Sequence, residues 1–298
     1  MLNIFTDLYK LTSHKKKKKV VVAAAHNIHV LEAITFAYTT NLADAILIGN
    51  AKEIEKIANE NNFNISNLEI IDESDDIKSA EIAVKCIYEQ QADILMKGRL
   101  NTAIIIKAVL SKKYGLIKNN RLSHLALFEL KNYHKLLGMT DGAINIAPGL
   151  RQKSEIINNA VEYLNKLGIE NPKVAALAGV EFVNPAMPAT LDAHDLKEMY
   201  LKGSIKNCII DGPLAFDNAI NKGSAQNKNI ISEVAGDADL LLVPNIESGN
   251  ILYKSLMYMA DAKCAGVVIG AKVPIVLTSR SDTKTTKINS IALAAAIE

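Results

Sequence analysis

The sequence predicts an α/β protein of two lobes, with mainly parallel sheets flanked by helices. Short apolar runs alternate with longer segments of helical character along most of the chain. Each short run is apolar on both faces, as expected of parallel strands that helices cover on two sides. At 298 residues the chain also exceeds the usual size of a single hydrophobic core, which favours two lobes.

The first lobe is predicted to begin with a buried strand at Val20–Ala25, directly after the basic run Lys15–Lys19. The expected elements that follow are a helix at Val30–Thr39, a strand at Ala45–Ile48, a helix at Lys52–Asn61, a strand at Leu68–Ile71, a helix at Ser79–Glu89 and a strand at Asp93–Met96. A helix at Ala103–Leu110 comes next, and either Asn101 or Thr102 can cap it.

The middle of the chain is less regular. Leu122–Phe128 alternates polar and apolar residues, which indicates an antiparallel strand. A strand is expected at Ala143–Ala147, then a helix at Lys153–Leu167 that Gly168 ends. The remaining expected elements are Lys173–Ala178, Leu191–Leu201, Asn207–Ile210, Asp239–Val243, Asn250–Ala260, Gly266–Ile269, Ile275–Leu277 and a last helix from about Asp282.

The change of lobe is placed at Gly138, where the irregular segment ends. The first lobe is then expected to comprise residues 1–137 with about 270–298, and the second to comprise residues 138–269. Composition alone leaves open whether the last strand and helix cross back to the first lobe.

Composition excludes several classes of function. Lysine and arginine number 34 against 32 acidic residues, and a net charge of +2 is too small for a nucleic-acid platform. No run of eighteen apolar residues occurs, so no membrane span is expected, and the first ten residues lack the apolar core of a secretory signal. The three cysteines, Cys86, Cys208 and Cys264, are far apart, which favours a reduced, cytoplasmic setting.

Several nucleotide-binding and catalytic motifs are missing. The chain contains no G-x-x-x-x-G-K-[ST] loop and no G-x-G-x-x-G turn after a strand. H-E-x-x-H and G-x-S-x-G are absent as well. The sequence therefore predicts neither a bound cofactor nor a metal site.

The loop Thr278–Asp282, after the last expected strand, carries the most distinctive chemistry. Arg280 is charged at any relevant pH, and its planar fork matches two oxygens of a phosphate. Ser279 can donate a hydrogen bond to the same group. Asp282 is either a general base or the cap of the final helix, and Arg280 could also form a surface ion pair.

Other expected strand ends carry further candidate ligand-binding residues. Asp211, Gly212 and Pro213 follow one strand; Asp211 could bind a substrate or cap the next helix, with Pro213 in its first turn. Asn184 can donate and accept hydrogen bonds in a proline-rich loop. The remaining candidates are Asp217, Asn218, Lys97 and Gly98, and an exposed surface lysine is the simpler alternative for Lys97.

Six segments in collinear order carry a family resemblance: Asp141–Pro148, Val180–Thr190, Asp211–Asn218, Ala235–Asp239, Gly249–Lys254 and Thr278–Asp282. Together they resemble the phosphate acetyl/butyryltransferase family from about Val20 to the C-terminus. The N-P-x-M-P-A-T and D-G-P-L-A-x-D-N segments are more similar to the butyryltransferase branch.

The resemblance implies two lobes with a fold of the isocitrate/isopropylmalate dehydrogenase kind, an active site in the cleft between them, and a homodimer or larger assembly. It implies transfer of a butyryl group between coenzyme A, as a substrate, and inorganic phosphate, with no acyl group on the protein. Ser279 and Arg280 match the family's serine–arginine pair. The acetyltransferase branch has a basic aspartate seven residues after that serine, where this chain has Thr286, so Asp282 is the nearest substitute.

Three other functions remain possible at this point. Acetyl transfer differs from butyryl transfer only in the volume of the acyl pocket. A metal-dependent hydroxyacid dehydrogenase on the related fold would need acidic ligands and an adenine-binding loop, and neither is evident in the sequence. A non-catalytic module that binds phosphate or acyl-CoA is disfavoured by the serine–arginine pair with a carboxylate close by.

Overall fold

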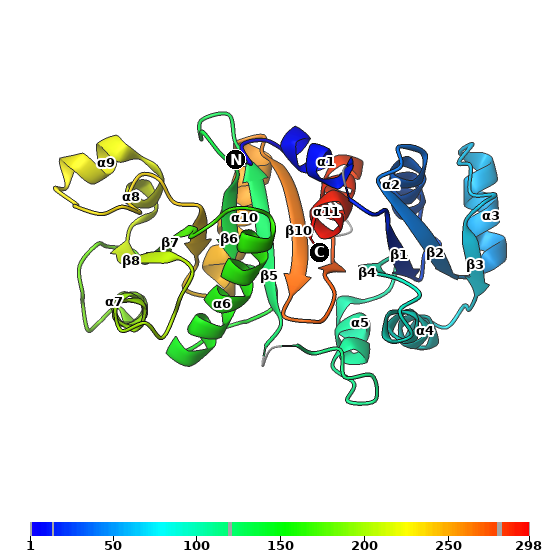
Figure 1. The fold of residues 1–298 in the computed structure, drawn as a ribbon, viewed down its shortest axis with the longest axis horizontal. Coiled ribbons are helices and arrows are strands. Elements are labelled where there is room, and N and C mark those ends of the chain that lie inside the picture. Colours follow the sequence, from blue (N-terminus) through cyan, green and yellow to red (C-terminus); the bar gives the residue numbers. More distant parts are fainter. Residues whose placement is uncertain (1, 14, 119–120, 279–281, 298) are drawn as a thin grey trace. The chain divides into compact units, whose positions relative to one another are not determined.

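The protein has an α/β fold with mostly parallel strands flanked by helices, as the alternating pattern predicts (Figure 1). The structure, a computed structural model, describes residues 2–13, 15–118, 121–278 and 282–297. The chain divides into two compact units. Thr6–Lys118 with Ala265–Glu298 is called the terminal unit below, and Met1–Phe5 with Asn119–Cys264 the central unit.

The terminal unit contains strands in the order β3-β2-β1-β4-β11-β10, all parallel except for the β10–β11 pair. The strands are β1 (Lys18–Ala23), β2 (Ala43–Gly49), β3 (Glu69–Asp72), β4 (Ile94–Lys97), β10 (Lys263–Ile269) and β11 (Ile275–Val276). The helices are α1 (Phe5–Ser13), α2 (Ile28–Thr39), α3 (Ala51–Glu60), α4 (Asp76–Tyr88), α5 (Thr102–Val109) and α11 (Lys284–Ala295).

Helices cover both faces of these strands, which explains why β1 is apolar throughout its second half. Val20, Val21 and Val22 are fully buried. Helix α2 packs against α11, and α4 packs against α5 and β1 (Figure 1). Asn101 caps α5 by accepting the Ala103 amide at 2.9 Å, so the first of the two predicted caps is confirmed. In the described part of the chain, no helix has the length and apolar character needed to cross a membrane.

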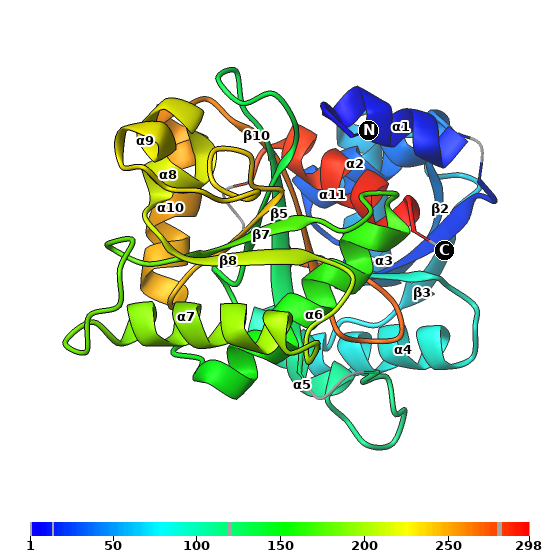
Figure 2. The same ribbon diagram turned by 60° about the vertical axis from the view of Figure 1, so that its left-hand side comes forward.

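The central unit contains strands in the order β5-β6-β9-β7-β8, of which β5 and β6 are antiparallel and the other pairs parallel. The strands are β5 (Ser123–Glu129), β6 (Leu137–Thr140), β7 (Lys173–Leu177), β8 (Ile209–Leu214) and β9 (Leu240–Leu242). The helices are α6 (Leu150–Lys166), α7 (Pro188–Leu201), α8 (Phe216–Ile220), α9 (Lys222–Asn227) and α10 (Ile246–Met259). Helix α7 runs alongside β8 (Figure 2).

Two predictions for the middle of the chain have opposite outcomes. The antiparallel strand expected at Leu122–Phe128 is confirmed as β5. The strand expected at Ala143–Ala147 is wrong, because the Asp141 carboxylate accepts the amides of Ala143 and Ile144, both at 2.9 Å, and turns the chain there. The strand of this region is β6, which ends just before that turn.

The compact units change at different residues from the predicted lobes. The sequence places the first change at Gly138, whereas Asn119–Leu137 belongs to the central unit. The physical reason is that β5 pairs with β6, with Leu127 opposite Gly138. The second change lies after Cys264 instead of at about residue 270.

An ionic cluster joins the amino ends of β7 and β9 in the central unit. Asp237 accepts Lys173 Nζ at 2.6 Å and lies 3.1 Å from Lys135 Nζ, which also contacts Asp239 at 2.6 Å. Burial raises the pKa of Asp237, but hydrogen bonds from Lys173 and Lys135 outweigh it and lower the pKa to about 2. The folded state therefore favours the ionised carboxylate.

We expect Asp237→Asn to destabilise the protein at pH 7 by about 1–2 kcal/mol, because each unit of pKa shift is worth about 1.4 kcal/mol and the carboxylate is partly exposed. The folded pKa lies below the ordinary 3.8, so this contribution is present above pH 3.8 and is lost as pH falls toward 2. Urea unfolding should show that the difference in the free energy of unfolding between wild type and variant becomes smaller as pH falls from 3.8 toward 2. Asp261→Asn, at an exposed pair with Lys131, is the control and should change little. An equal difference at pH 7 and pH 3 would contradict the prediction.

Candidate functional site

Three parallel strands of the terminal unit, β1, β4 and β11, end at one edge beside a cavity of about 360 Å³. In the order β3-β2-β1-β4 the chain proceeds outward from β1 to β3 and then returns to the other side of β1. Open α/β sheets bind ligands at such a switch point, outside the carboxyl ends of the strands. The lining residues are Asn27, Val30, Lys97, Gly98, Arg99, Thr278 and Lys287.

The loop after β1 places the start of α2 at this cavity. Asn27 caps the helix, and its side-chain oxygen accepts the amides of His29 at 3.1 Å and Val30 at 3.2 Å. The amino end of a helix carries partial positive charge, which favours an anion nearby. Sequence reasoning did not single out Asn27, although an asparagine between a strand and a helical pattern is a recognisable cap signal.

Lys97 and Gly98, both predicted from the sequence, lie together at the end of β4. The Lys97 side chain is buried, and its Nζ donates to the carbonyls of Gly98 and Leu100, both at 3.2 Å. The alternative of an exposed lysine is therefore wrong. At Gly98 an added Cβ would lie 2.1 Å from the Ala24 carbonyl oxygen, so only glycine allows the two loops to approach this closely.

The loop after β11 contributes Thr278, which is buried beside the cavity. Ser279 and Arg280, the predicted catalytic pair, lie outside the described residues. Asp282 precedes α11, whose cap is Thr283, with Oγ1 accepting the Thr286 amide at 3.2 Å. The alternative that Asp282 caps this helix is therefore wrong.

Lys287 is a cavity residue that sequence reasoning missed. It lies on α11, is only 3% exposed, and its Nζ donates to the Asp282 carbonyl at 2.8 Å. Burial lowers the pKa of Lys287, while the charge of Asp282 acts in the opposite direction. The available signal was a lysine beside an almost wholly apolar helical run. Arg99 adds a third cation, exposed and 3.8 Å from Glu53.

In the central unit, Asn184 forms hydrogen bonds within its own loop and with the start of α7. Its side-chain oxygen accepts the Ala186 amide at 3.0 Å, and its backbone amide donates to Thr190 Oγ1 at 2.9 Å. These bonds shape the entry to α7, which begins at Pro188.

Asp211, Gly212 and Pro213 lie inside β8 instead of after it. The Asp211 carboxylate forms an ion pair with Lys197 at 2.7 Å. The expected strand end at Ile210, the helix cap at Asp211 and the first-turn position of Pro213 are therefore wrong, since α8 begins at Phe216. The reason is that β8 is the last strand in the order, where proline is tolerated, and Gly212 packs closely against Ala176.

Asp217 and Asn218 lie in the first turn of α8. Asp217 is exposed, whereas Asn218 is fully buried, with Nδ2 3.5 Å from Glu181 Oε2. Within the described residues, Asn218 Oδ1 has no hydrogen-bond partner. None of the predicted residues of the central unit lines the 360 Å³ cavity. Among the predicted site residues that the structure describes, Lys97 and Gly98 are the two that line it.

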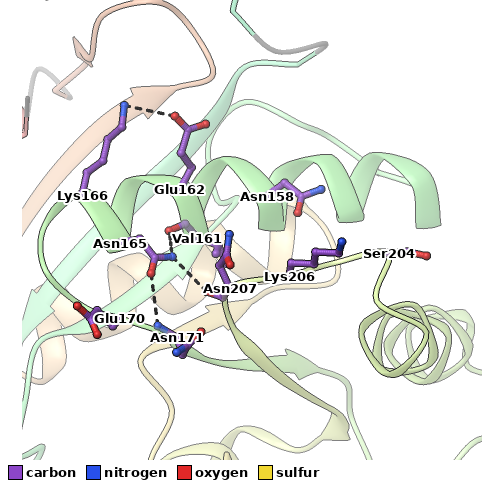
Figure 3. Close-up of a pocket in the computed structure, with 10 residues that line it drawn as sticks. All are labelled: Asn158, Val161, Glu162, Asn165, Lys166, Glu170, Asn171, Ser204, Lys206 and Asn207. Atoms are coloured by element: carbon purple, nitrogen blue, oxygen red, sulfur yellow. Dashed lines mark hydrogen bonds and ion pairs between the residues drawn. The ribbon is translucent and has the colours of Figure 1, made fainter.

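A larger cavity of about 710 Å³ lies in the central unit, between α6 and the loops before β7 and β8 (Figure 3). Asn165 Nδ2 donates to the carbonyls of Val161 at 2.8 Å and Asn207 at 3.1 Å, and Lys166 pairs with Glu162 at 3.3 Å. This cavity lies at the amino ends of its strands and contains none of the predicted residues, so it is the weaker candidate.

Among the described residues, no three histidine, cysteine, aspartate or glutamate side chains are grouped as a metal ion would require. The cavity is instead lined by cations, a hydroxyl and a helix start, which together suit an oxyanion.

Comparison with known proteins agrees with this chemistry. The family model "Phosphate acetyl/butaryl transferase" matches residues 4–86 and 77–295. The phosphate butyryltransferase of Clostridium acetobutylicum is 44% identical over 297 residues, covering 100% of this chain and 99% of that protein. The phosphate acetyltransferase of Thermotoga maritima is 40% identical over 273 residues, 92% of each chain. The crystal structure of a branched-chain phosphotransacylase from Enterococcus faecalis V583 is similar with a TM-score of 0.84 at 33% identity, covering 94% of this chain and 98% of that one.

Proposed function

Because the chain belongs to the phosphate acetyl/butaryl transferase family, we propose that it transfers an acyl group reversibly between coenzyme A and inorganic phosphate. The preferred reaction is butyryl-CoA with phosphate to give butyryl phosphate and coenzyme A. The similarity to a phosphate butyryltransferase over the whole chain carries this proposal. Phosphate acetyltransferase activity is the second candidate, since a relative of that name is 40% identical.

The mechanism needs three contributions from the protein. In the acyl-CoA-forming direction, the thiol of coenzyme A must lose a proton before it attacks the acyl phosphate, and we assign the general base to Asp282. Ser279 and Arg280 stabilise the tetrahedral oxyanion and the departing phosphate. Both substrates bind together, so no acyl group is attached to the protein, and coenzyme A is a substrate, not a resident cofactor.

The wider arrangement in this proposal also follows the family. The fold is of the isocitrate/isopropylmalate dehydrogenase kind, and the enzyme is a cytoplasmic homodimer or larger homo-oligomer. In this proposal Lys97 and Gly98 of the terminal unit are substrate-binding residues. Asn184 and the segments 211–213 and 217–218 of the central unit are substrate-binding residues as well.

The test measures release of free thiol from acetyl-, butyryl- and branched acyl-CoA, with and without inorganic phosphate. We expect release to require phosphate, with kcat/KM larger for butyryl-CoA than for acetyl-CoA. A larger value for acetyl-CoA would favour the second candidate. Absence of release, or release at the same rate without phosphate, would refute acyl transfer to phosphate.

In the acyl-CoA-forming direction, we expect Asp282→Asn to lower kcat by about 10²–10⁴-fold, the usual contribution of a general base. The loss should be largest below the thiol pKa of about 8.5 and should shrink above it, where the thiol ionises unaided. Thermal stability should be retained, whereas the matched variant Thr283→Ala should lose about 1 kcal/mol with the helix cap and keep its pH profile. A pH-rate profile of Asp282→Asn that superimposes on that of wild type would exclude the base role.

A further inference from the structure

Two lysines of the terminal unit are buried at one cavity, although lysine is among the residues least often buried. Lys97 is 6% exposed and Lys287 is 3% exposed. They come from different elements, the end of β4 and the first turns of α11, 190 positions apart in the chain. Both line the 360 Å³ cavity at the carboxyl ends of β1, β4 and β11.

Each ammonium group is held in place by backbone carbonyls of the loop beside it. Lys97 Nζ donates to Gly98 and Leu100, and Lys287 Nζ donates to Asp282. Carbonyl oxygens orient an ammonium group without cancelling its charge. Lys97 thereby fixes the residues that follow β4, and Lys287 fixes Asp282, just before α11.

The electrostatics of the cavity favour an anion. Arg99 adds a third positive charge at the rim, and Thr278 adds a buried hydroxyl. Burial makes the charged form of Lys287 costly and lowers its pKa, and the charge of Asp282 offsets part of this cost. An oxyanion placed between the two ammonium groups would offset this cost, since charge-assisted hydrogen bonds are the strong ones.

We propose that Lys287 and Lys97 together form the subsite for the transferred phosphate, with Lys287 as a substrate-binding residue of the acyl-transfer reaction. The subsite rests on the proposed function and adds a residue that lies eight positions after Ser279, next to Thr286. Thr286 itself is buried and engaged with the helix cap, 3.1 Å from Thr283 Oγ1. The chemical class of the ligand is a phosphoryl oxyanion, which inorganic phosphate or the phosphates of coenzyme A could supply. Because Thr278 directly precedes Ser279 and Arg280, to which the proposed function gives the departing phosphate, we assign the ligand to inorganic phosphate.

The test compares Lys287→Met with Lys284→Met, a matched control on the same helix whose side chain is 44% exposed and pairs with Glu32 at 3.0 Å. We expect Lys287→Met to raise KM for inorganic phosphate at least about tenfold, the value of one lost charged hydrogen bond. KM for acyl-CoA should change less than about twofold. Lys284→Met should match wild type in both constants.

Direct binding provides a second readout that does not depend on turnover. Inorganic phosphate should raise the melting temperature of wild type and of Lys284→Met, and this shift should be reduced or absent in Lys287→Met and Lys97→Met. If Lys287→Met does not fold, Lys287→Gln and Lys97→Met serve in its place.

The outcomes separate the subsite from the overall function. A wild-type enzyme without phosphate-dependent thiol release would refute the proposed function. An active wild type with an unchanged KM for phosphate in the lysine variants would overturn the subsite alone. A rise only in KM for acyl-CoA would show that the lysines bind coenzyme A, and this result would also overturn the phosphate subsite.

Discussion

Arg280→Ala is expected to lower kcat for acyl transfer by about two orders of magnitude or more, with the fold retained. The guanidinium group is the one side chain of the Thr278–Asp282 loop that can bind two phosphate oxygens at once, and it keeps its charge at any working pH. Its removal would leave the charge that develops on phosphate and on the tetrahedral oxyanion without its main partner.

Two further variants make this test specific. Arg280→Lys keeps the charge but not the planar fork, so it should recover only part of the lost rate. Arg151→Ala is the control for loss of an arginine, because that side chain is 86% exposed. It forms an ion pair with Glu155 of the same helix, α6, at 3.4 Å. Circular dichroism should be the same for all three. Activity of Arg280→Ala close to wild type would remove the arginine from the mechanism.

Gly98→Ala is expected to destabilise the protein by about 2–3 kcal/mol, the upper part of the usual range for overpacking. An alanine Cβ would lie 2.1 Å from the Ala24 carbonyl oxygen and 2.7 Å from the Ala23 carbonyl oxygen. These are backbone atoms, which cannot move aside as the end of a side chain can. The loops after β1 and β4 would have to separate, which strains the 2.8 Å bonds from the Gly98 amide to Ala23 and from the Arg99 amide to Ala24.

Urea unfolding measures this loss, and Gly179→Ala is the matched control. At Gly179 an added Cβ would meet only the terminal methyl of Met187, at 2.9 Å, and that flexible group can rotate away. We expect the control to unfold near the wild-type midpoint. The Gly98 variant should also lose phosphate binding, because the same loops shape the cavity. A wild-type unfolding midpoint for Gly98→Ala would show that the loops separate at little cost.

The alternation of strands and helices could be predicted because it depends on local patterns. Buried valines in β1 and an asparagine before α5 have the same meaning in almost any context. The prediction failed where a side chain competes with the backbone pattern. The apolar residues of 143–147 look like a strand, but Asp141 accepts the amides that a strand would need.

The site could be predicted only where it, too, depends on a local sequence pattern. Lys97 and Gly98 could be found because they directly follow a strand, and their place at the cavity agrees with that reasoning. Lys287 was missed because nearly all of α11 from Thr286 onward is buried, polar residues included. Helical periodicity identifies residues by the contrast between a buried and an exposed face. A helix that is buried on all sides has no such contrast.

The sequence by itself determined the α/β class, the chemistry of the loops after the strands and the membership of the family. Only the tertiary structure decided which loops meet. Strand order depends on pairings between residues far apart in the chain, and β11 joins β4 although about 180 residues separate them in sequence. Local propensity cannot encode such a pairing, because its free energy comes from backbone bonds and burial that exist only once both strands are in place.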